Sequence, residues 1–333
     1  MVNSFPFISV IIPCRNEEKF IGNCLNSLIE QDYPKENLEI LIVDGMSGDS
    51  TREIIKKFNI QHSIFNIQLI DNPGRFTPQG LNIGIRNARG EFVMRMDAHA
   101  EYPVDYISKC LKYSKESGAD NVGGIIKTLP VKSTIFAKAI AKVLSHPFGA
   151  AGSYFRIGVS KPRWVDTVFG GCYKKGVFDK IGYFNEKLIR SQDIEFNKRL
   201  KKAGGKILLV PEIIATYYPQ AKLSDFFRHN FVDGIWTIYP LKFGVRIFSF
   251  RHLIPLFFVL GFLVGLILGF FFWWGKAIFI LIFGVYLLLN LFFSFGVALK
   301  ENPKYFFVLP LAFFSRHFGY GLGSIWGLIK III

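Results

Sequence analysis

The first hundred residues alternate between short apolar runs and longer amphipathic stretches. The four apolar runs are ISVII (8–12), LEILIVDG (38–45), IQLIDN (67–72) and GEFVMRMDAH (90–99). In the stretch after the first run, Leu25, Leu28 and Ile29 have the spacing that places them on one face of a helix. Strands that alternate with helices build βαβ units, so this part of the chain predicts an α/β domain with a mostly parallel sheet.

The pattern is less regular after residue 120. We expect a strand in DNVGGIIKT, a helix over 134–148, and a strand, a turn and a short helix over 164–184. The segment SQDIEFNKRLKKAGG (191–205) predicts a helix with a basic C-terminal end that stops at two glycines. The basic and aromatic residues of 223–250 are typical of helices that lie at a membrane surface.

Two long apolar segments near the C-terminus carry no charged residue. They are 253–275 and 277–299, and each exceeds the roughly 20 residues that cross a bilayer as a helix. A buried core helix is the alternative, but runs this long and this rich in Leu and Phe favour membrane spans. Because little more than Lys276 separates them, we expect a helical hairpin.

A third apolar stretch, 305–329, contains Arg316 and His317, and we expect another membrane-embedded helix that spans or re-enters. Lysines and arginines flank the open end of the hairpin, which predicts that the N-terminal domain faces the cytoplasm. The N-terminal sequence lacks the basic region and cleavage site of a signal peptide, in agreement with this orientation. The expected organisation is an α/β domain at 1–222, an interfacial amphipathic segment at 223–252 and a membrane domain at 253–333.

The composition is basic, with 40 Lys and Arg against 25 Asp and Glu and a net charge of +15. No nucleic-acid motif accompanies this charge, so anionic lipid headgroups and a phosphorylated substrate explain it better beside membrane spans. The four cysteines are scattered without CxxC spacing. They indicate neither a zinc site nor a disulfide framework, and they suit a reducing cytoplasm.

Polar side chains follow the expected strands at their carboxyl ends, at 14–17, Asp44 and Asp97. Parallel sheets bind ligands at this edge. Asp97 and His99 stand two residues apart on an extended segment, so their side chains point the same way and can share a divalent metal. Mn²⁺ accepts both oxygen and imidazole ligands whereas Mg²⁺ prefers oxygen, so we expect Mn²⁺ or Mg²⁺. A solvated end of a strand is the alternative for this pair.

Two further carboxylates have both a chemical and a structural interpretation. Asp44 can accept hydrogen bonds from a base or a ribose, or it can form a turn. Asp193 can deprotonate an acceptor hydroxyl as a general base, or it can be an aspartate that the helix dipole favours at a helix start. The residues alone leave these alternatives open.

Four motifs, of which the opening one has two parts, resemble the family 2 glycosyltransferases, which have the GT-A fold. SVIIPCRNEEKFIGNCLNSLIEQDYP and EILIVDGMSGDST resemble the opening of that family, and GEFVMRMDAHAEYP occupies the place of its DxD motif. SQDIEFNKRLKKAG occupies the place of its ED motif, and VFGGCYKKGVFDKIGYFNE resembles the acceptor-side segment before it. The resemblance covers about residues 8–218. Together with the C-terminal apolar helices, the sequence looks most like succinoglycan-biosynthesis-type membrane glycosyltransferases.

This resemblance implies that 1–222 is a Rossmann-like GT-A catalytic domain followed by transmembrane helices. It also implies inverting transfer of a sugar, in a single displacement, from a nucleotide sugar, above all a UDP-sugar. Asp193 would be the catalytic base, and Asp97 and His99 would be the metal ligands. The resemblance places Gly170, Gly171 and Gln192 on the acceptor side. It assigns nucleotide-sugar binding to Pro13, Arg15, Glu17, Asp44, Arg75 and Asp97.

The sequence departs from the family pattern at three positions. Gly45 stands where the VDDGS pattern has its second aspartate, and His99 replaces the third-position aspartate of the DxD motif. Gln192 replaces the acidic neighbour of Asp193 in the ED motif. A QxxRW motif, typical of processive synthases, is absent, which favours the addition of one sugar at a time.

We therefore expect an enzyme of polysaccharide or cell-surface glycan synthesis in the cell membrane. Its acceptor would be a lipid-linked or growing glycan at the cytoplasmic face, with no nucleic-acid partner. One alternative is a polyprenyl-phosphate sugar synthase, in which a lipid phosphate is the nucleophile and Asp193 matters less than Asp97. Another is a non-catalytic membrane scaffold of a polysaccharide assembly complex, which has no need of Asp97, His99 and Asp193 together.

Overall fold

The computed structural model describes residues 5–150 and 152–333, and the chain forms two compact units. The α/β unit comprises the chain up to Lys127 together with Gly158–Tyr217. The helical unit comprises Thr128–Ile157 and Tyr218–Ile333. Residues 128–157, which lie inside the domain expected at 1–222, thus cluster with the C-terminal helices.

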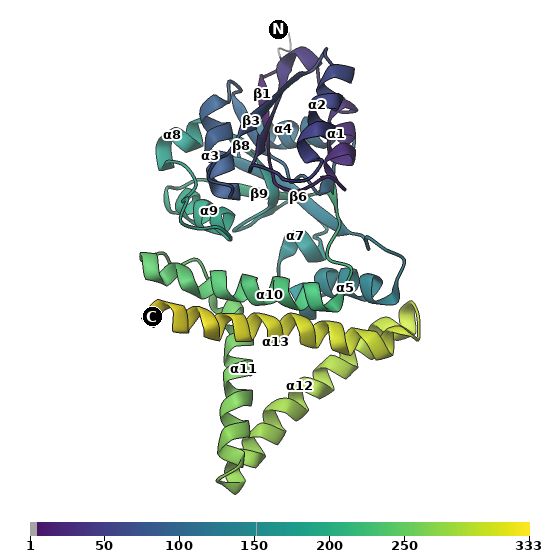
Figure 1. The fold of residues 1–333 in the computed structure, drawn as a ribbon, viewed down its shortest axis with the longest axis vertical. Helices are drawn as coiled ribbons and strands as arrows, with labels where there is room; N and C mark the ends of the chain where they lie inside the picture. The colour runs from purple at the N-terminus through teal and green to yellow at the C-terminus, as the bar shows by residue number, and fades with distance from the viewer. Residues whose placement is uncertain (1–4, 151) are drawn as a thin grey trace. The chain divides into compact units, whose positions relative to one another are not determined.

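The α/β unit is built on one sheet, which has nine strands within the described residues (Figure 1). The strands are β1 (Ile8–Cys14), β2 (Leu38–Asp44), β3 (Asn66–Asp71), β4 (Phe92–Arg95), β5 (Ala100–Glu101), β6 (Asn121–Thr128), β7 (Arg163–Trp164), β8 (Phe169–Lys174) and β9 (Ile207–Tyr217). Their order is β3-β2-β1-β4-β8-β6-β9-β5, with β7 paired to β9.

The sheet has a parallel half and a half with antiparallel pairs. β1 is parallel to β2 and β4, and β2 is parallel to β3, so the four strands expected from the apolar runs form the parallel half. β8 runs antiparallel to β4 and β6, and β5 and β7 run antiparallel to β9. The predicted α/β class is confirmed, but the sheet is mixed and not mostly parallel as expected, because β5, β7 and β8 pair with their neighbours in antiparallel fashion.

Helices pack closely on the parallel strands. Every residue of β2 is buried, as expected for a parallel strand covered on both faces. Gly84 permits the close approach of α3 to β1, because a Cβ atom at Gly84 would lie 2.4 Å from Ile11 Cγ2. The helices of this unit are α1 (Ile21–Ile29), α2 (Thr51–Gln61), α3 (Thr77–Asn87), α4 (Tyr106–Ser117), α8 (Gly176–Ile181) and α9 (Gln192–Lys202), with a 3₁₀ turn η1 (Lys35–Asn37).

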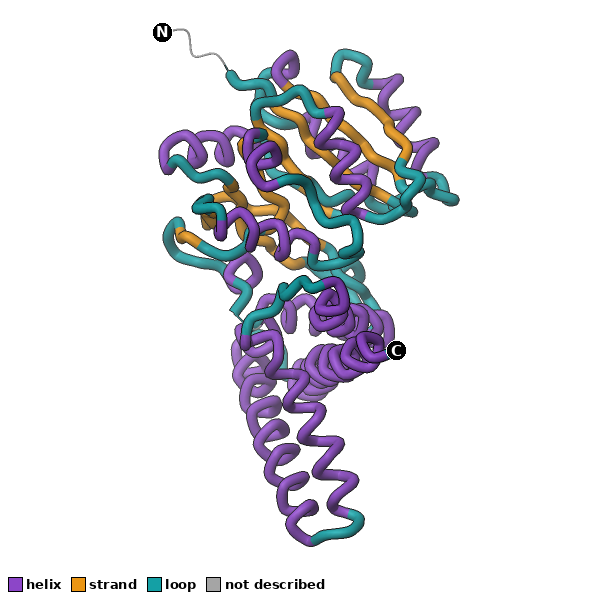
Figure 2. Tube along the Cα trace, turned by 90° about the vertical axis from the view of Figure 1, so that its left-hand side faces the viewer, coloured by secondary structure: helices purple, strands orange, loops and turns teal. Residues whose placement is uncertain are grey.

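The helical unit contains the long apolar helices (Figure 2). Its elements are α5 (Ile135–Ser145), α6 (Pro147–Ala150), α7 (Tyr154–Ile157), α10 (Leu223–Ile238), the 3₁₀ turn η2 (Tyr239–Phe243), α11 (Phe250–Gly269), α12 (Trp273–Lys300) and α13 (Tyr305–Ile332). A core around Phe226, Leu309 and Phe313 joins α5, α10 and α13.

The helices α11 and α12 form an apolar hairpin, and both are long and apolar enough to cross a membrane. Only 22% and 17% of their most apolar 18-residue windows are buried, whereas a core helix of a soluble protein is mostly buried. Two candidate membrane spans are therefore present, as predicted. The turn lies at 270–272, ahead of the expected position, and Lys276 belongs to the first turn of α12.

The third apolar stretch forms α13, which is not among the candidate spans in the described residues. It runs beside α10 and crosswise to the hairpin (Figure 1). Gly319, Gly323 and Gly327 allow this contact, because a Cβ at Gly323 would lie 1.9 Å from the carbonyl oxygen of Phe231. These three glycines contact Phe227, Phe231 and Ile235 of α10, so the contacts are four residues apart on both helices. The two helices therefore run parallel with their backbones in contact.

Candidate functional site

Strained backbone is concentrated at one edge of the α/β unit. Within the described residues, the non-glycine residues with positive φ are Asn16 (57°), Met46 (57°), Arg75 (66°) and Ser191 (61°). The first three lie in the loops after β1, β2 and β3, and Ser191 immediately precedes α9. Such conformations are unfavourable for side chains with a Cβ atom and collect at functional sites. This edge is where the sequence predicts ligand binding.

Asp44 organises the loop after β2. Its carboxylate is fully buried and accepts hydrogen bonds from the Ser47 hydroxyl (2.5 Å) and the Ser47 backbone N–H (3.1 Å). Arg52 forms an ion pair with Asp44 through Nη1 (2.7 Å) and another with Asp71 through Nη2 (2.8 Å). The structure thus gives Asp44 partners within the chain, and it identifies Arg52 as a residue that the sequence pattern did not single out.

The loops after β1, β2 and β3 close on one another around Gly45. A Cβ at Gly45 would lie 2.9 Å from the Arg75 carbonyl oxygen and 3.2 Å from Arg15 Cβ. The glycine that departs from the family pattern therefore leaves room for the backbone of Arg75 and the side chain of Arg15. Pro13 lies deeper, in β1 opposite Val43 of β2 and next to Gly80 of α3.

His99 is held by Glu17. Its Nδ1 lies 3.1 Å from Glu17 Oε1, and the backbone N–H of Glu17 donates to Thr51 Oγ1 (2.8 Å). Burial opposes protonation of His99, but the Glu17 hydrogen bond and the charge of Asp97 raise its pKa above the usual value. With Nδ1 facing Glu17, Nε2 is the nitrogen oriented for another partner.

Arg95 links the two carboxylates of the predicted chemistry. Its guanidinium lies 3.1 Å from Asp97 Oδ1 through Nη2 and 3.5 Å from Asp193 Oδ2 through Nη1. Burial opposes ionisation of Asp97, but Arg95 and His99 hold its pKa below its ordinary value. The Nε atom of Arg95 is buried without a hydrogen-bond partner in the described part of the chain. One guanidinium thus brings together the strand end of β4 and the start of α9.

The first turn of α9 positions Asp193. The backbone N–H of Ile194 donates to Asp193 Oδ1 (2.9 Å), and the side chain of Asp193 is 33% exposed, so it remains accessible. Gln192, beside it, is buried. The helix is anchored one turn later, because Glu195 forms a bidentate ion pair with Arg199 at 2.6 and 3.0 Å.

Two consecutive glycines let β8 pass close to the end of β4. Gly170 and Gly171 have φ values of +67° and +106°, which favour glycine. A Cβ at Gly170 would lie 2.9 Å from the Arg95 carbonyl oxygen, and one at Gly171 would lie 2.8 Å from Asn121 Oδ1. Gly170 therefore lies against the backbone that carries Arg95, whereas Gly171 leaves room for Asn121 of β6.

The donor atoms for a metal are few. In the described residues, no group of three His, Cys, Asp or Glu side chains is arranged to hold a metal ion. Asp97 and His99 supply one carboxylate and one imidazole, and the Glu17–His99 contact is the kind that fixes the orientation of a metal-binding histidine. Mg²⁺-type ions are commonly held by one or two carboxylates together with substrate phosphates, so the residues fit a metal that the donor diphosphate helps to bind.

Comparisons with known proteins agree with the motifs. The family model described as Glycosyl transferase family 2 matches residues 9–179. The chain is 32% identical over 331 residues, 97% of this chain and 98% of the relative, to the dolichyl N-acetyl-alpha-D-glucosaminyl phosphate 3-beta-D-2,3-diacetamido-2,3-dideoxy-beta-D-glucuronosyltransferase of Methanococcus voltae. It is 28% identical to the succinoglycan biosynthesis protein ExoA of Rhizobium meliloti, over 70% of this chain and 74% of that protein.

A solved structure supports the fold. The mannosyltransferase PcManGT from Pyrobaculum calidifontis, solved in complex with GDP-Man and Mn²⁺, matches 97% of this chain and 88% of its own with a TM-score of 0.62. Its sequence identity to this chain is 17%, so the likeness extends to the GT-A-type fold alone. The resemblance inferred from the motifs and the fold class are both confirmed.

Proposed function

The chain belongs to glycosyltransferase family 2, and on that premise we propose that it adds one sugar from a nucleotide sugar to a lipid-linked acceptor. Transfer proceeds with inversion, at the cytoplasmic face of the cell membrane, in the synthesis of a cell-surface glycan. The observation that carries this proposal is the guanidinium of Arg95, which lies 3.1 Å from Asp97 and 3.5 Å from Asp193. A donor-binding carboxylate and a candidate base therefore lie on either side of one cation.

The nucleotide sugar binds at the edge formed by the loops after β1, β2 and β3. We assign its contacts to Pro13, Arg15, Glu17, Asp44, Arg75 and Asp97. The side chain of Arg15 and the backbone carbonyl of Arg75 both lie against Gly45. We assign the positive charges of Arg15 and Arg75 to the diphosphate. Asp44 acts together with Arg52, because its carboxylate already holds that guanidinium. A UDP-sugar is the donor that we propose first.

Asp97 and His99 would hold the divalent ion, Mn²⁺ or Mg²⁺, which would supply positive charge next to the donor diphosphate. Glu17 fixes the His99 ring, so that Nε2 is presented on the side away from Glu17. Asp193 accepts the proton of the acceptor hydroxyl, for which its accessible position at the first turn of α9 is suited. Gly170, Gly171 and Gln192 belong to the acceptor side.

The lipid-linked acceptor is supported by the relative that aligns along nearly the whole chain. The name of the Methanococcus voltae relative identifies a dolichyl sugar phosphate as the substrate of that protein. The hairpin of α11 and α12 is suited to place an enzyme beside such a lipid, since both helices are candidate membrane spans. We therefore place this chain in the membrane as an integral protein, with the α/β unit on the cytoplasmic side.

The test separates this proposal from a polyprenyl-phosphate sugar synthase. Purified full-length protein would be incubated with Mn²⁺ and radiolabelled UDP-, GDP- or dTDP-sugars, with either a polyprenyl phosphate or a polyprenyl-linked sugar as acceptor. We expect label in the organic phase only with the lipid-linked sugar, and a disaccharide after mild acid release. Label on the bare polyprenyl phosphate would support the synthase instead, and binding without transfer for every donor would support a scaffold.

A further inference from the structure

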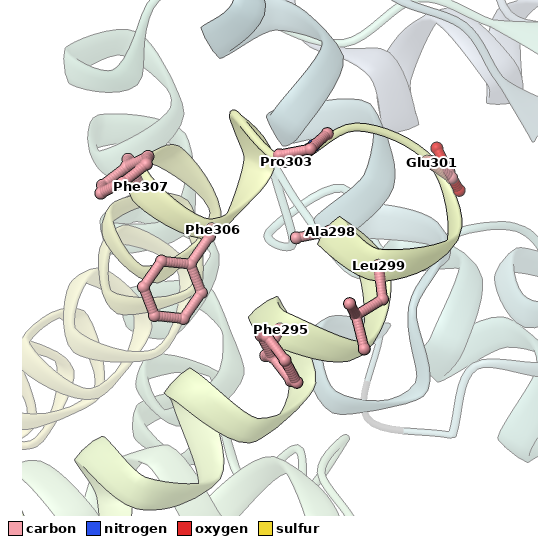
Figure 3. Close-up of a pocket in the computed structure, with 7 residues that line it drawn as sticks. All are labelled: Phe295, Ala298, Leu299, Glu301, Pro303, Phe306 and Phe307. Carbon is pink, nitrogen blue, oxygen red and sulfur yellow. The ribbon is translucent and has the colours of Figure 1, made fainter.

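An open apolar pocket lies at the corner where α12 meets α13. It has a volume of about 390 Å³, which falls within the range of small-molecule sites. Figure 3 shows Phe306 on one side of a common space and Phe295, Ala298 and Leu299 on the other. The remaining lining residues, Glu301, Pro303 and Phe307, come from the connecting loop and the first turn of α13. We call these seven residues the corner pocket.

The corner pocket is continuous with the outward surface of a candidate membrane span. Phe295 and Leu299 belong to the last two turns of α12, and they are 51% and 70% exposed. Ala298, at the floor, is buried and belongs to the core that joins α5 and α13. Apolar side chains exposed around a concave floor are unfavourable in water, so the pocket is suited to a hydrocarbon chain that reaches it along α12.

The segment that contains the corner pocket carries a net positive charge. In the segment 295–307 the sequence holds two lysines, Lys300 and Lys304, and one acidic residue, Glu301. Glu301 is already paired with Lys142 of α5 at 2.7 Å. Lys300 and Lys304 are both exposed, so they leave this segment with a net positive charge beside the pocket. This combination favours a ligand with a negative group next to its hydrocarbon.

We propose that the corner pocket binds an acyl chain of an anionic phospholipid of the surrounding bilayer, with the lipid phosphate at Lys300 and Lys304. The pocket opens toward the lipid-facing side of α12, which favours a bilayer lipid that exchanges freely. A bound lipid here fixes the 301–304 loop and hence the angle between the hairpin and α13. The inference depends on the proposed membrane placement, but it does not depend on sugar transfer.

The test uses the full-length protein in phosphatidylcholine nanodiscs that contain a small fraction of phosphatidylglycerol with a photoreactive group on one chain. After irradiation, adducts are mapped along the sequence by mass spectrometry. We expect adducts to be enriched several-fold on 295–307 over the middle of α12. Leu299→Trp fills the pocket from an exposed position and removes most of this enrichment. Gly284→Trp is the matched control, because a Cβ at Gly284 meets no atom within 4 Å, and it leaves the enrichment unchanged.

The charge beside the pocket is tested separately with Lys300→Gln combined with Lys304→Gln. This variant is expected to lose the preference for phosphatidylglycerol over an equally labelled phosphatidylcholine. Even labelling along α11 and α12, the same in Leu299→Trp and Gly284→Trp, would overturn the proposal. Displacement of the adducts by a polyprenyl phosphate but not by unlabelled phosphatidylglycerol would also overturn it, and would assign the pocket to the acceptor. Adducts anywhere on the hairpin report membrane insertion, so loss of the pocket and loss of the proposed function are distinguishable.

Discussion

Arg95→Met removes the cation that lies between Asp97 and Asp193. The side chains of Arg95 and Asp97 are 14% and 17% exposed, so their ion pair is largely buried, whereas Asp193 is 33% exposed and farther away at 3.5 Å. Breaking a buried pair from one side costs about 3–5 kcal/mol. Since both groups retain some solvent, we expect the lower end, about 3 kcal/mol, for the α/β unit.

This loss is measurable as a melting temperature. For a domain of about 150–250 residues, each kcal/mol corresponds to about 2–4 °C, so Arg95→Met should melt about 6–12 °C lower in detergent. Arg95→Lys keeps the charge but not the forked geometry, and it should recover part of the difference. Displacement of Asp97 and Asp193 by even about 1 Å is enough to lower kcat about 100-fold, measured as steady-state nucleoside diphosphate release.

The pH dependence gives a second readout with a defined sign. In the wild type the pKa of Asp97 is lowered, so its ionised form stabilises the fold above about pH 4, and this contribution is lost as pH falls through the lowered pKa. In Arg95→Met, burial opposes ionisation with less compensation and the Asp97 pKa rises, so stability is lost as pH increases. The difference in melting temperature between the two proteins should therefore be larger at about pH 7 than at about pH 4.5.

Arg89→Met is the matched control, because Arg89 also pairs with a buried carboxylate, that of Glu39, at 2.9 Å. Glu39 lies near the start of β2, away from the loops of the site, and keeps hydrogen bonds from Ser9 Oγ (2.5 Å) and the Arg89 backbone N–H (2.7 Å). The Arg89→Met variant should lose some stability, and its kcat should be unchanged. A melting shift below about 2 °C in Arg95→Met, or a loss of kcat in Arg89→Met as large as that in Arg95→Met, would exclude this role of Arg95.

Three further predictions follow from the backbone contacts and the metal assignment. Gly323→Leu should separate α13 from α10 and lower the melting temperature of the helical unit, because its Cβ would lie 1.9 Å from the Phe231 carbonyl oxygen. Gly296→Leu is the control and should be tolerated, because a Cβ there meets nothing within 4 Å. Gly170→Ala should lower kcat by displacing the Arg95 backbone. Gly118→Ala is the control, because Gly118 has a similar φ of +72° and a Cβ there meets nothing within 4 Å; it should cost only about 1 kcal/mol of stability and leave the kinetics normal. EDTA should abolish transfer and Mn²⁺ should restore it; activity that survives chelation would reject the assignment of a metal to His99.

The centre of the parallel half of the sheet could be predicted because β1 and β2 are buried almost throughout and therefore form continuous apolar runs in the sequence. The runs at 8–12 and 38–45 correspond to β1 and β2 within a few residues. The other strands are harder to recognise. β7 has two residues and β8 begins with FGG, so neither has a periodic apolar pattern, and their pairing depends on contacts remote in sequence.

That the candidate residues after β1, β2 and β4 share one edge of the sheet was also predictable, since the carboxyl ends of parallel strands lie at the same edge. Arg95 was visible as a charge between the methionines of VMRMD, but its two partners were not, because Asp193 reaches it from the start of α9. The orientation of α13 could not be predicted either. Its apolar composition satisfies membrane and protein packing alike, and only the contacts of Gly319, Gly323 and Gly327 with α10 distinguish them.

The role of Asp193 as the catalytic base is tested most directly by Asp193→Asn, measured in two ways on the same purified protein. The first measurement is nucleotide-sugar binding in the presence of Mn²⁺, and the second is acceptor-dependent release of nucleoside diphosphate. Because Asp193 is assigned to the acceptor hydroxyl and not to the donor, we predict binding within about twofold of wild type and loss of transfer by at least about 100-fold. Wild-type turnover by Asp193→Asn would contradict the assignment of the base and favour a phosphate nucleophile, which needs little deprotonation.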